Sequence, residues 1–223
     1  MTSYFITATG TDIGKTYVSA NLLRHWRREQ RPVAALKPVM SGFDPQAVAA
    51  SDAGQLLLAM DAPMDAGGLN LISPWRFAAP LSPDMAAARE GKTIPYGKLV
   101  ATCRSVADMM PDDGRLVIEG VGGVFVPIDD THTVMDWMRD LGLPILLVAG
   151  SYLGTISHTL SALAAMKLHG LEPHAVIVNE SPVSPVPLGE AVEVLRRHAP
   201  GNRILALKRH ANAADVAALA NTL

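Results

Sequence analysis

The sequence has few of the features that define several common classes of protein. Its 223 residues include one cysteine, Cys103, which excludes an intramolecular disulfide and a cysteine-rich metal site. Nineteen lysines and arginines against 21 aspartates and glutamates give a net charge of −2, whereas a general nucleic-acid binder carries a basic excess. No apolar run approaches the roughly 18 residues of a membrane span, and the first ten residues lack the basic start of a signal peptide. We therefore expect a cytoplasmic protein that binds neither nucleic acid nor membrane.

Side chains that commonly bind zinc or act as nucleophiles are also sparse. The seven histidines show no H-x3-H or H-E-x-x-H spacing, which argues against a zinc site. His158 follows a predicted strand and is expected to be structural. Cys103 lies on a predicted helix, where we expect a small buried hydrophobe.

Short, uniformly apolar segments recur along the chain, and they predict strands that are buried on both faces, as in a parallel sheet. These strands are expected at Tyr4–Ala8, Pro32–Leu36, Leu116–Glu119, Pro144–Ala149, Ala175–Asn179 and Ile204–Leu207. Segments with helical periodicity lie between them, including one that steps by four through Val18, Leu22 and Trp26. This alternation predicts an α/β fold, a doubly wound and mainly parallel sheet flanked by helices. Its functional loops are expected at the carboxyl ends of the strands.

The stretch from Ser41 to Arg115 is less regular and contains seven prolines. We predict helices at Gln46–Met60, Asp84–Glu90 and Tyr96–Met109, joined by loops that lie over the sheet. A compact second domain in this stretch is the alternative. We expect a single domain over residues 1–223.

A phosphate-binding loop is indicated where the first strand runs into Thr9-Gly10-Thr11-Asp12-Ile13-Gly14-Lys15-Thr16. A glycine-rich turn that enters a helix exposes backbone N–H groups, and the helix N-terminus adds partial positive charge. Lys15 is expected to reach the β- and γ-phosphates, and the Thr16 hydroxyl to ligate Mg²⁺. The strict G-x4-G-K-[ST] pattern requires glycine at position 9, where this chain has Thr9, so an ordinary strand–helix turn remains an alternative.

Charged residues also follow two other predicted strands. Lys37 leaves the second strand four residues before Ser41, where it can join Lys15 on one anion or simply extend to water. Glu119 ends the third strand, a position suited to a Mg²⁺ ligand or to a helix cap. Asp52, after Ser51, is either a ligand or part of an N-cap.

Together these residues resemble the dethiobiotin synthetase family, the ATP-dependent carboxylases of biotin biosynthesis. The resemblance covers most of the chain and is clearest over residues 1–180. It rests on Thr11–Thr16, Lys37-Pro38-Val39-Met40-Ser41-Gly42, Ser51-Asp52-Ala53, Pro74–Pro83, Glu119–Gly123, Leu153-Gly154-Thr155 and Val178-Asn179-Glu180. The fold it implies is of the P-loop NTPase type.

The resemblance also implies a reaction, a cofactor set and partners. An amine of 7,8-diaminopelargonic acid captures CO₂ as a carbamate, the carbamate takes the γ-phosphoryl group of ATP, and the second amine closes the ring. The products are dethiobiotin, ADP and phosphate, and the enzyme requires ATP and Mg²⁺. The family further implies a homodimer. The apolar segment from Leu160 to Met166 independently predicts a helix that needs a second partner, either another subunit or residues 42–114 of the same chain.

The resemblance assigns a role to each matching residue. It implies that Lys15 and Lys37 neutralise the carbamate and the transferring phosphoryl group. The residues it implies for the diamine and carbamate are Thr11, Ser41, Gly122 and Leu153, and those for the Mg²⁺ shell are Thr16, Asp52 and Glu119. The residues it implies around the nucleotide are Asp12, Ile13, Gly14, Lys15, Thr16, Tyr17, Asp52, Glu119, Gly120, Gly122, Asn179 and Glu180, with Asn179 on the base.

The chain departs from the family pattern at several positions. Ala8 and Gly10 stand where the family more often has Gly and Asp, and Asp12 where a longer acid often occurs. The last strand ends in Lys208-Arg209 instead of the usual Gly-x-x-Pro, which bears on the adenine-side contacts.

Three other functions compete with this one. A P-loop ATPase switch of the partitioning or maturation type is the main alternative, although its signature lysine near the loop start is replaced here by Thr9-Gly10-Thr11. A related amidating synthetase would need room for a glutaminase domain. A non-catalytic nucleotide-binding module would have little use for Lys37 and Ser41 together.

Overall fold

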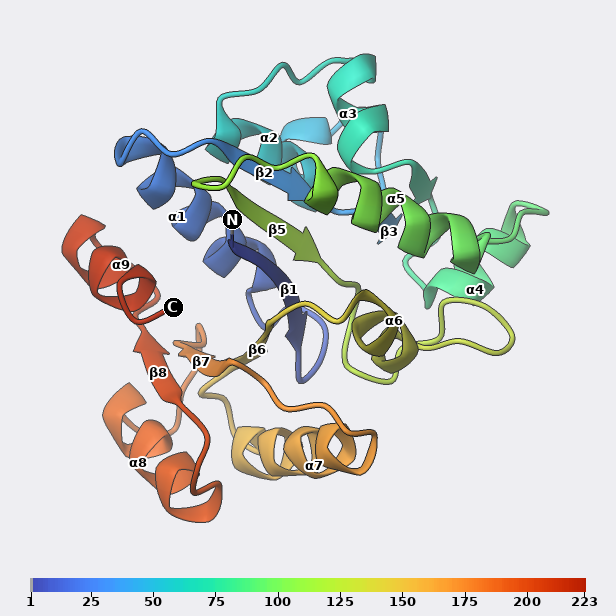
Figure 1. The fold of residues 1–223 in the computed structure, drawn as a ribbon. Helices are drawn as coiled ribbons and strands as arrows, with labels where there is room; N and C mark the ends of the chain where they lie inside the picture. The colour runs from blue at the N-terminus through green and yellow to red at the C-terminus, as the bar shows by residue number, and fades with distance from the viewer. Residues whose placement is uncertain (1) are drawn as a thin grey trace.

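The computed structural model describes residues 2–223 and contains a six-stranded, entirely parallel sheet in the order β2-β5-β1-β6-β7-β8 (Figure 1). The strands are β1 Thr2–Ala8, β2 Val33–Leu36, β5 Arg115–Glu119, β6 Ile145–Ala149, β7 Ala175–Asn179 and β8 Ile204–Leu207. The three central strands are almost wholly buried because helices cover both faces. The predicted parallel α/β sheet is confirmed, and each strand boundary lies within two residues of its prediction.

The helices form two layers around the sheet. They are α1 Lys15–Arg28, α2 Asp52–Met60, α3 Ala66–Ile72, α4 Pro83–Arg89, α5 Tyr96–Asp108, α6 Val134–Leu141, α7 Thr155–Leu168, α8 Leu188–His198 and α9 Ala213–Ala220. Figure 1 shows α1 and α9 on one side of the sheet and α5, α6 and α7 on the other. Phe5 of β1 meets Trp137 of α6 edge to face at 4.9 Å, which ties the central strand to this second layer.

The chain changes direction across the sheet at β1. From β1 it crosses to β2 on one side, and from β5 it crosses back over β1 to β6 on the other. Such a switch point opens a crevice outside the carboxyl ends of the strands, where α/β proteins bind ligands. The loops after β1, β2 and β5 therefore lie beside one another at this edge.

The segment between β2 and β5 differs most from the prediction. The helix predicted at Gln46–Met60 is wrong in its first part, where a short 3₁₀ turn, η1 Val48–Ala50, is followed by extended Ser51 and then by α2. Ser51 breaks the helix because its hydroxyl accepts from Gly54 N at 3.1 Å and caps α2. A Cβ at Gly54 would overlap the Val48 carbonyl, so glycine is needed where the turn folds back on the helix.

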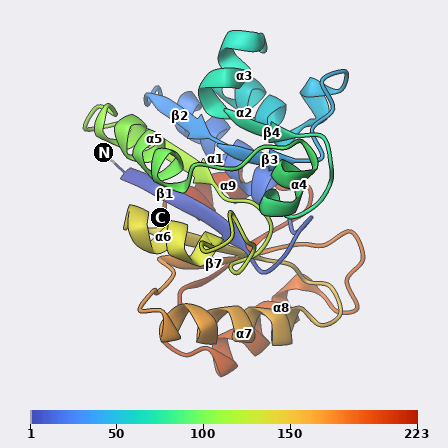
Figure 2. The same ribbon diagram turned by 90° about the vertical axis from the view of Figure 1, so that its right-hand side faces the viewer.

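This segment also contains a feature that no sequence pattern indicated. Two three-residue strands, β3 Val39–Ser41 and β4 Trp75–Phe77, form a separate parallel pair near the same edge of the main sheet (Figure 2). Strands this short carry no periodicity. The pairing of β3 with β4 fixes the position of Ser41. The single domain expected over residues 1–223 stays a prediction.

Helices α4 and α5 begin and end within one residue of their predicted bounds. Cys103 of α5 is fully buried, as predicted, and burial raises the pKa of its thiol to about 12. Over the described residues 2–223, no helix is long and apolar enough to cross a membrane.

Candidate active site

The phosphate loop joins β1 to α1, and α1 begins at Lys15 as the motif predicts. Gly14 has φ 99°, a left-handed conformation that favours glycine, and a Cβ there would overlap the Asn179 amide. Asn179 Nδ2 donates to the Ile13 carbonyl at 3.0 Å, so the end of β7 holds the loop from the side. The helix N-terminus and its free N–H groups therefore face the open edge of the sheet.

Lys15 lies within this loop and is almost completely buried. Its Nζ donates to the Gly122 carbonyl at 3.0 Å and to the Gly10 carbonyl at 3.4 Å, with no carboxylate among these contacts. Burial, followed by the nearby charge of Lys37, lowers the pKa of Lys15 to about 8. The Lys15 ammonium is thus held by two backbone carbonyls, and an anionic ligand can replace these carbonyls as its partner.

Four side chains form a compact group, which we call the acid–lysine cluster: Thr16 of α1, Lys37 directly after β2, Asp52 of α2 and Glu119 of β5. The Thr16 hydroxyl lies 2.9 Å from Asp52 Oδ1 and 2.8 Å from Glu119 Oε1. Lys37 Nζ lies 2.9 Å from Asp52 Oδ2 and from Glu119 Oε1, and 2.8 Å from the Gly120 carbonyl. The cluster thus contains the three residues predicted to ligate Mg²⁺ together with Lys37, the second predicted cation.

Electrostatics bind the cluster together. Burial alone would lower the pKa of Lys37, but the charges of Glu119 and Asp52 outweigh it and raise that pKa. Burial likewise opposes the charge of Asp52, yet Lys37 outweighs it and lowers the pKa of the carboxyl. The sequence left open whether Asp52 only caps a helix. Ser51 is the cap, and Asp52 is free to join the cluster.

Sequence reasoning missed Ser19, which holds the far oxygen of Glu119. The Ser19 hydroxyl, fully buried in α1, lies 2.8 Å from Glu119 Oε2 and 2.9 Å from the Lys15 carbonyl. Its position one helical turn after Lys15, on the face that packs against the sheet, was the available signal. With Oε2 held in this way, Oε1 is directed toward Thr16 and Lys37.

A cleft of about 850 Å³ opens beside the cluster. The residues around it are Thr11, Asp12, Gly14, Lys15, Thr16, Lys37, Met40, Ser41, Gly42, Ala50, Ser51, Asp52, Pro80, Leu81, Ser82, Pro83, Val121, Gly122 and Val126. The Ser41 hydroxyl is buried there without a hydrogen-bond partner, which suits a polar ligand. Most of the predicted phosphate, metal and substrate residues thus border one space. Ile13, Glu119 and Gly120 do not line it, and further exceptions follow below.

Three residues predicted around the nucleotide, Tyr17, Asn179 and Glu180, lie away from this cleft. Tyr17 bridges to the segment after β8, since its hydroxyl donates to Lys208 O at 3.2 Å and accepts from Ala211 N at 3.1 Å. Glu180 Oε2 accepts from Arg209 N at 3.1 Å, and the Asn179 Oδ1 atom is buried without a partner. The departure from the family pattern at Lys208-Arg209 therefore falls directly beside these three residues.

One predicted substrate residue does not reach the cleft of its own chain. Leu153, in the loop before α7, is 85% exposed and borders no part of the cleft. His158 is an exposed residue whose Nδ1 hydrogen-bonds with the Tyr152 hydroxyl at 2.8 Å. The structural role expected for it stays a prediction.

The donor set of the cluster fits Mg²⁺ with a nucleotide. A hydroxyl and two carboxylates converge within hydrogen-bonding distance, and Mg²⁺ typically takes one or two carboxylates together with phosphate oxygens and water. Within residues 2–223 there is no group of three or more His, Cys, Asp or Glu side chains placed to hold a metal. The remaining ligands would come from nucleotide and solvent.

The parallel sheet, its switch point and the phosphate loop define a P-loop NTPase of the α/β class. The AAA domain family matches residues 2–213. The MinC:MinD cell division protein complex of Aquifex aeolicus contains a similar fold, with a TM-score of 0.55 at 12% identity over 99% of this chain and 86% of that chain. A ParA family ATPase of Chlorobium tepidum TLS gives 0.55 at 15% identity, over 100% and 90%. At such identities the likeness concerns the fold alone.

Sequence relatives specify the family. An ATP-dependent dethiobiotin synthetase BioD of Acidiphilium cryptum is 51% identical over 199 residues, which are 89% of this chain and 88% of that protein. Proteins of the same name from Methylobacterium nodulans and Phenylobacterium zucineum are 45% and 44% identical, over 94% and 100% of this chain and 94% and 95% of their own. The chain belongs to the ATP-dependent dethiobiotin synthetase family, a family of ligases of biotin biosynthesis, and the predicted resemblance is confirmed.

Proposed function

We propose that this protein uses ATP, Mg²⁺ and CO₂ to close the ureido ring of dethiobiotin on 7,8-diaminopelargonic acid. One observation carries the proposal: a phosphate loop, two buried lysines and an unpartnered serine hydroxyl border the same cleft. A nucleotide switch needs the first of these features. A ligase needs all of them, because its second substrate must lie in line with the γ-phosphate.

The nucleotide half of the site rests on the turn from Thr11 to Thr16. Backbone N–H groups at the start of α1 and the Lys15 ammonium are the donors we assign to the phosphates. Thr16, Asp52 and Glu119 would hold Mg²⁺, which when bound neutralises phosphate charge. Tyr17, Asn179 and Glu180 are proposed on the base side, with the unpartnered Asn179 Oδ1 as the acceptor for an exocyclic amine. Asp12, Ile13, Gly14, Gly120 and Gly122 complete the proposed nucleotide set.

The substrate half rests on Thr11, Ser41 and Lys37. One amine of the diamine attacks CO₂ and loses a proton to give the carbamate. A carbamate oxygen then attacks the γ-phosphorus, the bond to ADP breaks, and a carbamic-phosphoric anhydride forms. The second amine attacks the carbamoyl carbon and expels phosphate. Negative charge builds on carbamate and phosphoryl oxygens, and we assign its neutralisation to Lys15 and Lys37, which both border the cleft.

A partitioning ATPase is the main alternative to the ligase, because MinD and ParA proteins have a similar fold. Two observations favour the ligase. The loop start is Thr9-Gly10-Thr11 and has no lysine, and β3 brings Ser41 to a cleft it shares with Lys37. Relatives at 44–51% identity carry the synthetase name.

A homodimer is proposed from the loop before α7 and from the ends of that helix. Leu153 and Leu168 are 85% and 88% exposed, while the inner face of α7 packs on its own chain through Thr155, Thr159, Ala162 and Met166. We assign these two exposed leucines to contacts with a second subunit. A two-fold interface formed by α7 of both subunits would bring Leu153 toward the other subunit's cleft.

The decisive test of the activity is direct. Pure protein is incubated with Mg-ATP, bicarbonate and 7,8-diaminopelargonic acid, and dethiobiotin and ADP are measured by mass spectrometry. We expect both products in equal amounts and ADP release that depends on the diamine. Diamine-independent ATP hydrolysis without dethiobiotin would favour the switch.

The dimer is tested separately by light scattering across the micromolar range. A Lys37→Ala subunit mixed with a Leu153→Asp subunit should regain activity through hybrid dimers that contain one intact site. A fully active monomer would contradict the dimer. A stable dimer with no regained activity would contradict the shared site.

A further inference from the structure

The contacts of Lys37 conflict with its proposed place at the substrate. An ammonium group has three N–H donors, and Lys37 has three acceptors within 2.9 Å: Glu119 Oε1, Asp52 Oδ2 and the Gly120 carbonyl. The side chain is 3% exposed. No donor is left for a carbamate oxygen, so at least one of these contacts has to break before Lys37 can bind substrate.

The two carboxylates that hold Lys37 are also the proposed metal ligands. Thr16 touches both of them, and Ser19 pins the remaining oxygen of Glu119. A buried lysine does not leave two carboxylates unless another cation takes over their charge. A divalent cation on Asp52 and Glu119 is that replacement, because it attracts the same oxygens more strongly than a single positive charge does.

We infer that Lys37 is the resident cation of the metal site and that it leaves Asp52 and Glu119 when a divalent cation binds them. Its release is what makes it available to the carbamate. This inference rests on the proposed function for the role of the freed lysine, and it implies an order in which metal-nucleotide binding precedes productive binding of the carbamate. The competition between Lys37 and the metal is independent of the chemistry that follows.

The test measures metal affinity instead of turnover. Mn²⁺ is titrated into nucleotide-free protein and free Mn²⁺ is followed by electron paramagnetic resonance, with the parent, Lys37→Met and Lys15→Met compared. We expect Lys37→Met to bind Mn²⁺ at least about tenfold more tightly than the parent, because a competing positive charge has been removed from both ligands. Unchanged or weaker binding would overturn the inference.

Lys15→Met is the matched control for net charge. Lys15 lies close enough for Glu119 and Asp52 to act on its pKa, yet its Nζ donates to backbone carbonyls. Removal of its charge should tighten Mn²⁺ binding by about threefold or less. Equal gains in both variants would show a general field effect and would overturn direct competition.

A measurement on the parent protein covers the case in which Lys37→Met does not fold. In protein labelled with ¹⁵N at lysine, the buried Lys37 ammonium should give a protected signal in the presence of a non-hydrolysable ATP analogue and EDTA. Saturating Mg²⁺ should shift that signal or remove it through faster exchange with water. A signal that stays unchanged would overturn the inference. None of these arms contains diamine or CO₂, so a failed ligase assay leaves the result intact.

Discussion

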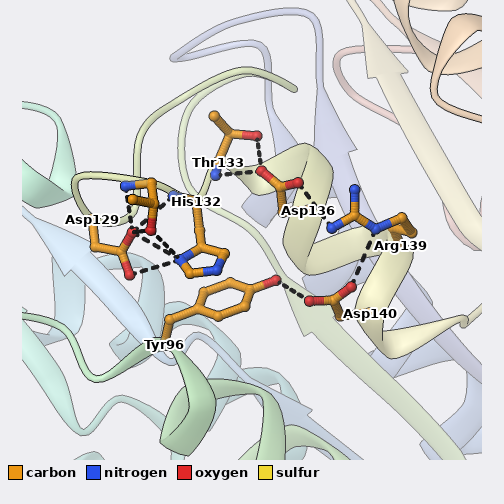
Figure 3. A network of polar contacts seen from close by, with 8 residues as sticks. Tyr96, Asp129, His132, Thr133, Asp136, Arg139 and Asp140 are labelled. Carbon is orange, nitrogen blue, oxygen red and sulfur yellow. Dashed lines mark hydrogen bonds and ion pairs between the residues drawn. The ribbon is translucent and has the colours of Figure 1, made fainter.

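Two polar networks in this protein each contain several charged side chains, yet only one of them borders the cleft beside the phosphate loop. The acid–lysine cluster joins residues 15 to 103 positions apart, and Glu119 and Lys37 are almost fully buried. The second network, on α5, α6 and the loop before α6, consists of Tyr96, Asp129, His132, Thr133, Asp136, Arg139 and Asp140 (Figure 3). Most of its contacts join residues three or fewer positions apart.

The local network completes backbone structure. Asp129 accepts from the backbone N–H groups of Thr131 and His132, and Asp136 accepts from Thr133 N in a capping box at the start of α6. The His132 ring stacks on Tyr96 at 3.8 Å, and the Tyr96 hydroxyl donates to Asp140 at 2.8 Å. These groups satisfy one another at the surface, whereas the cluster borders a cleft and a phosphate loop.

Of the substitutions that test the difference between the two networks, Lys37→Ala should have the largest effect. Lys37→Ala should lower turnover by on the order of 10²-fold or more, because it removes a cation that stabilises charge in the transition state. Nucleotide binding should remain. Steady-state rates at saturating diamine, with calorimetric ATP-analogue affinity as the control, measure both. Near-normal turnover would remove Lys37 from the catalytic group.

The acids of the cluster should affect the metal requirement. Glu119→Gln and Asp52→Asn should each raise the Mg²⁺ concentration for half activity by about tenfold, because each removes an anionic oxygen ligand. Ser19→Ala should give a smaller rise in the same direction, since it only frees Glu119 to move. Titration curves that coincide with the parent in both acid variants would mean that these carboxylates are structural.

Lys15 should make nucleotide binding sensitive to pH. Because its pKa is lowered to about 8, the ammonium loses its proton, and so its charge, as pH rises through that value. The affinity for a non-hydrolysable ATP analogue should therefore fall by up to about tenfold between about pH 7.5 and pH 9. Calorimetry across this pH range measures the affinity for the analogue. Lys15→Arg, which stays charged, should flatten the profile, and an equally steep profile would assign the titration elsewhere.

The local network should show the smallest effect. Tyr96→Phe removes the hydrogen bond to Asp140 and keeps the ring that stacks on His132, so unfolding free energy should fall by about 1 kcal/mol. Turnover and Mg²⁺ requirement should not change, because the pair lies outside the cleft. Chemical denaturation and a rate assay suffice. A tenfold loss of turnover would mean that the two networks are coupled.

The prediction from sequence fails mainly in the segment between β2 and β5. The sequence pattern predicts one helix through Val48–Ala50, where the structure has a 3₁₀ turn, and it gives no signal for the β3–β4 pair. The β3–β4 pair depends on contacts between residues far apart in sequence, such as the pairing of Ser41 with Phe77. The turn depends on the local cap by Ser51 and on the close approach of Gly54 to Val48. The placement of Ser41 in the cleft follows from that pairing, although its residue type pointed to a role.

The sequence by itself determined the parallel sheet, the phosphate loop and the family, because buried strands and a glycine turn before a helix leave local patterns of residue type. It also named Lys37, Asp52 and Glu119 as candidates. Only the tertiary structure decided that these three share one hydrogen-bonded group and that Ser19 holds Glu119. It also decided that Lys37 is already fully engaged by the two acids and the Gly120 carbonyl. Such facts depend on how separate strands and helices pack against one another, and no local pattern records the distance between side chains a hundred residues apart.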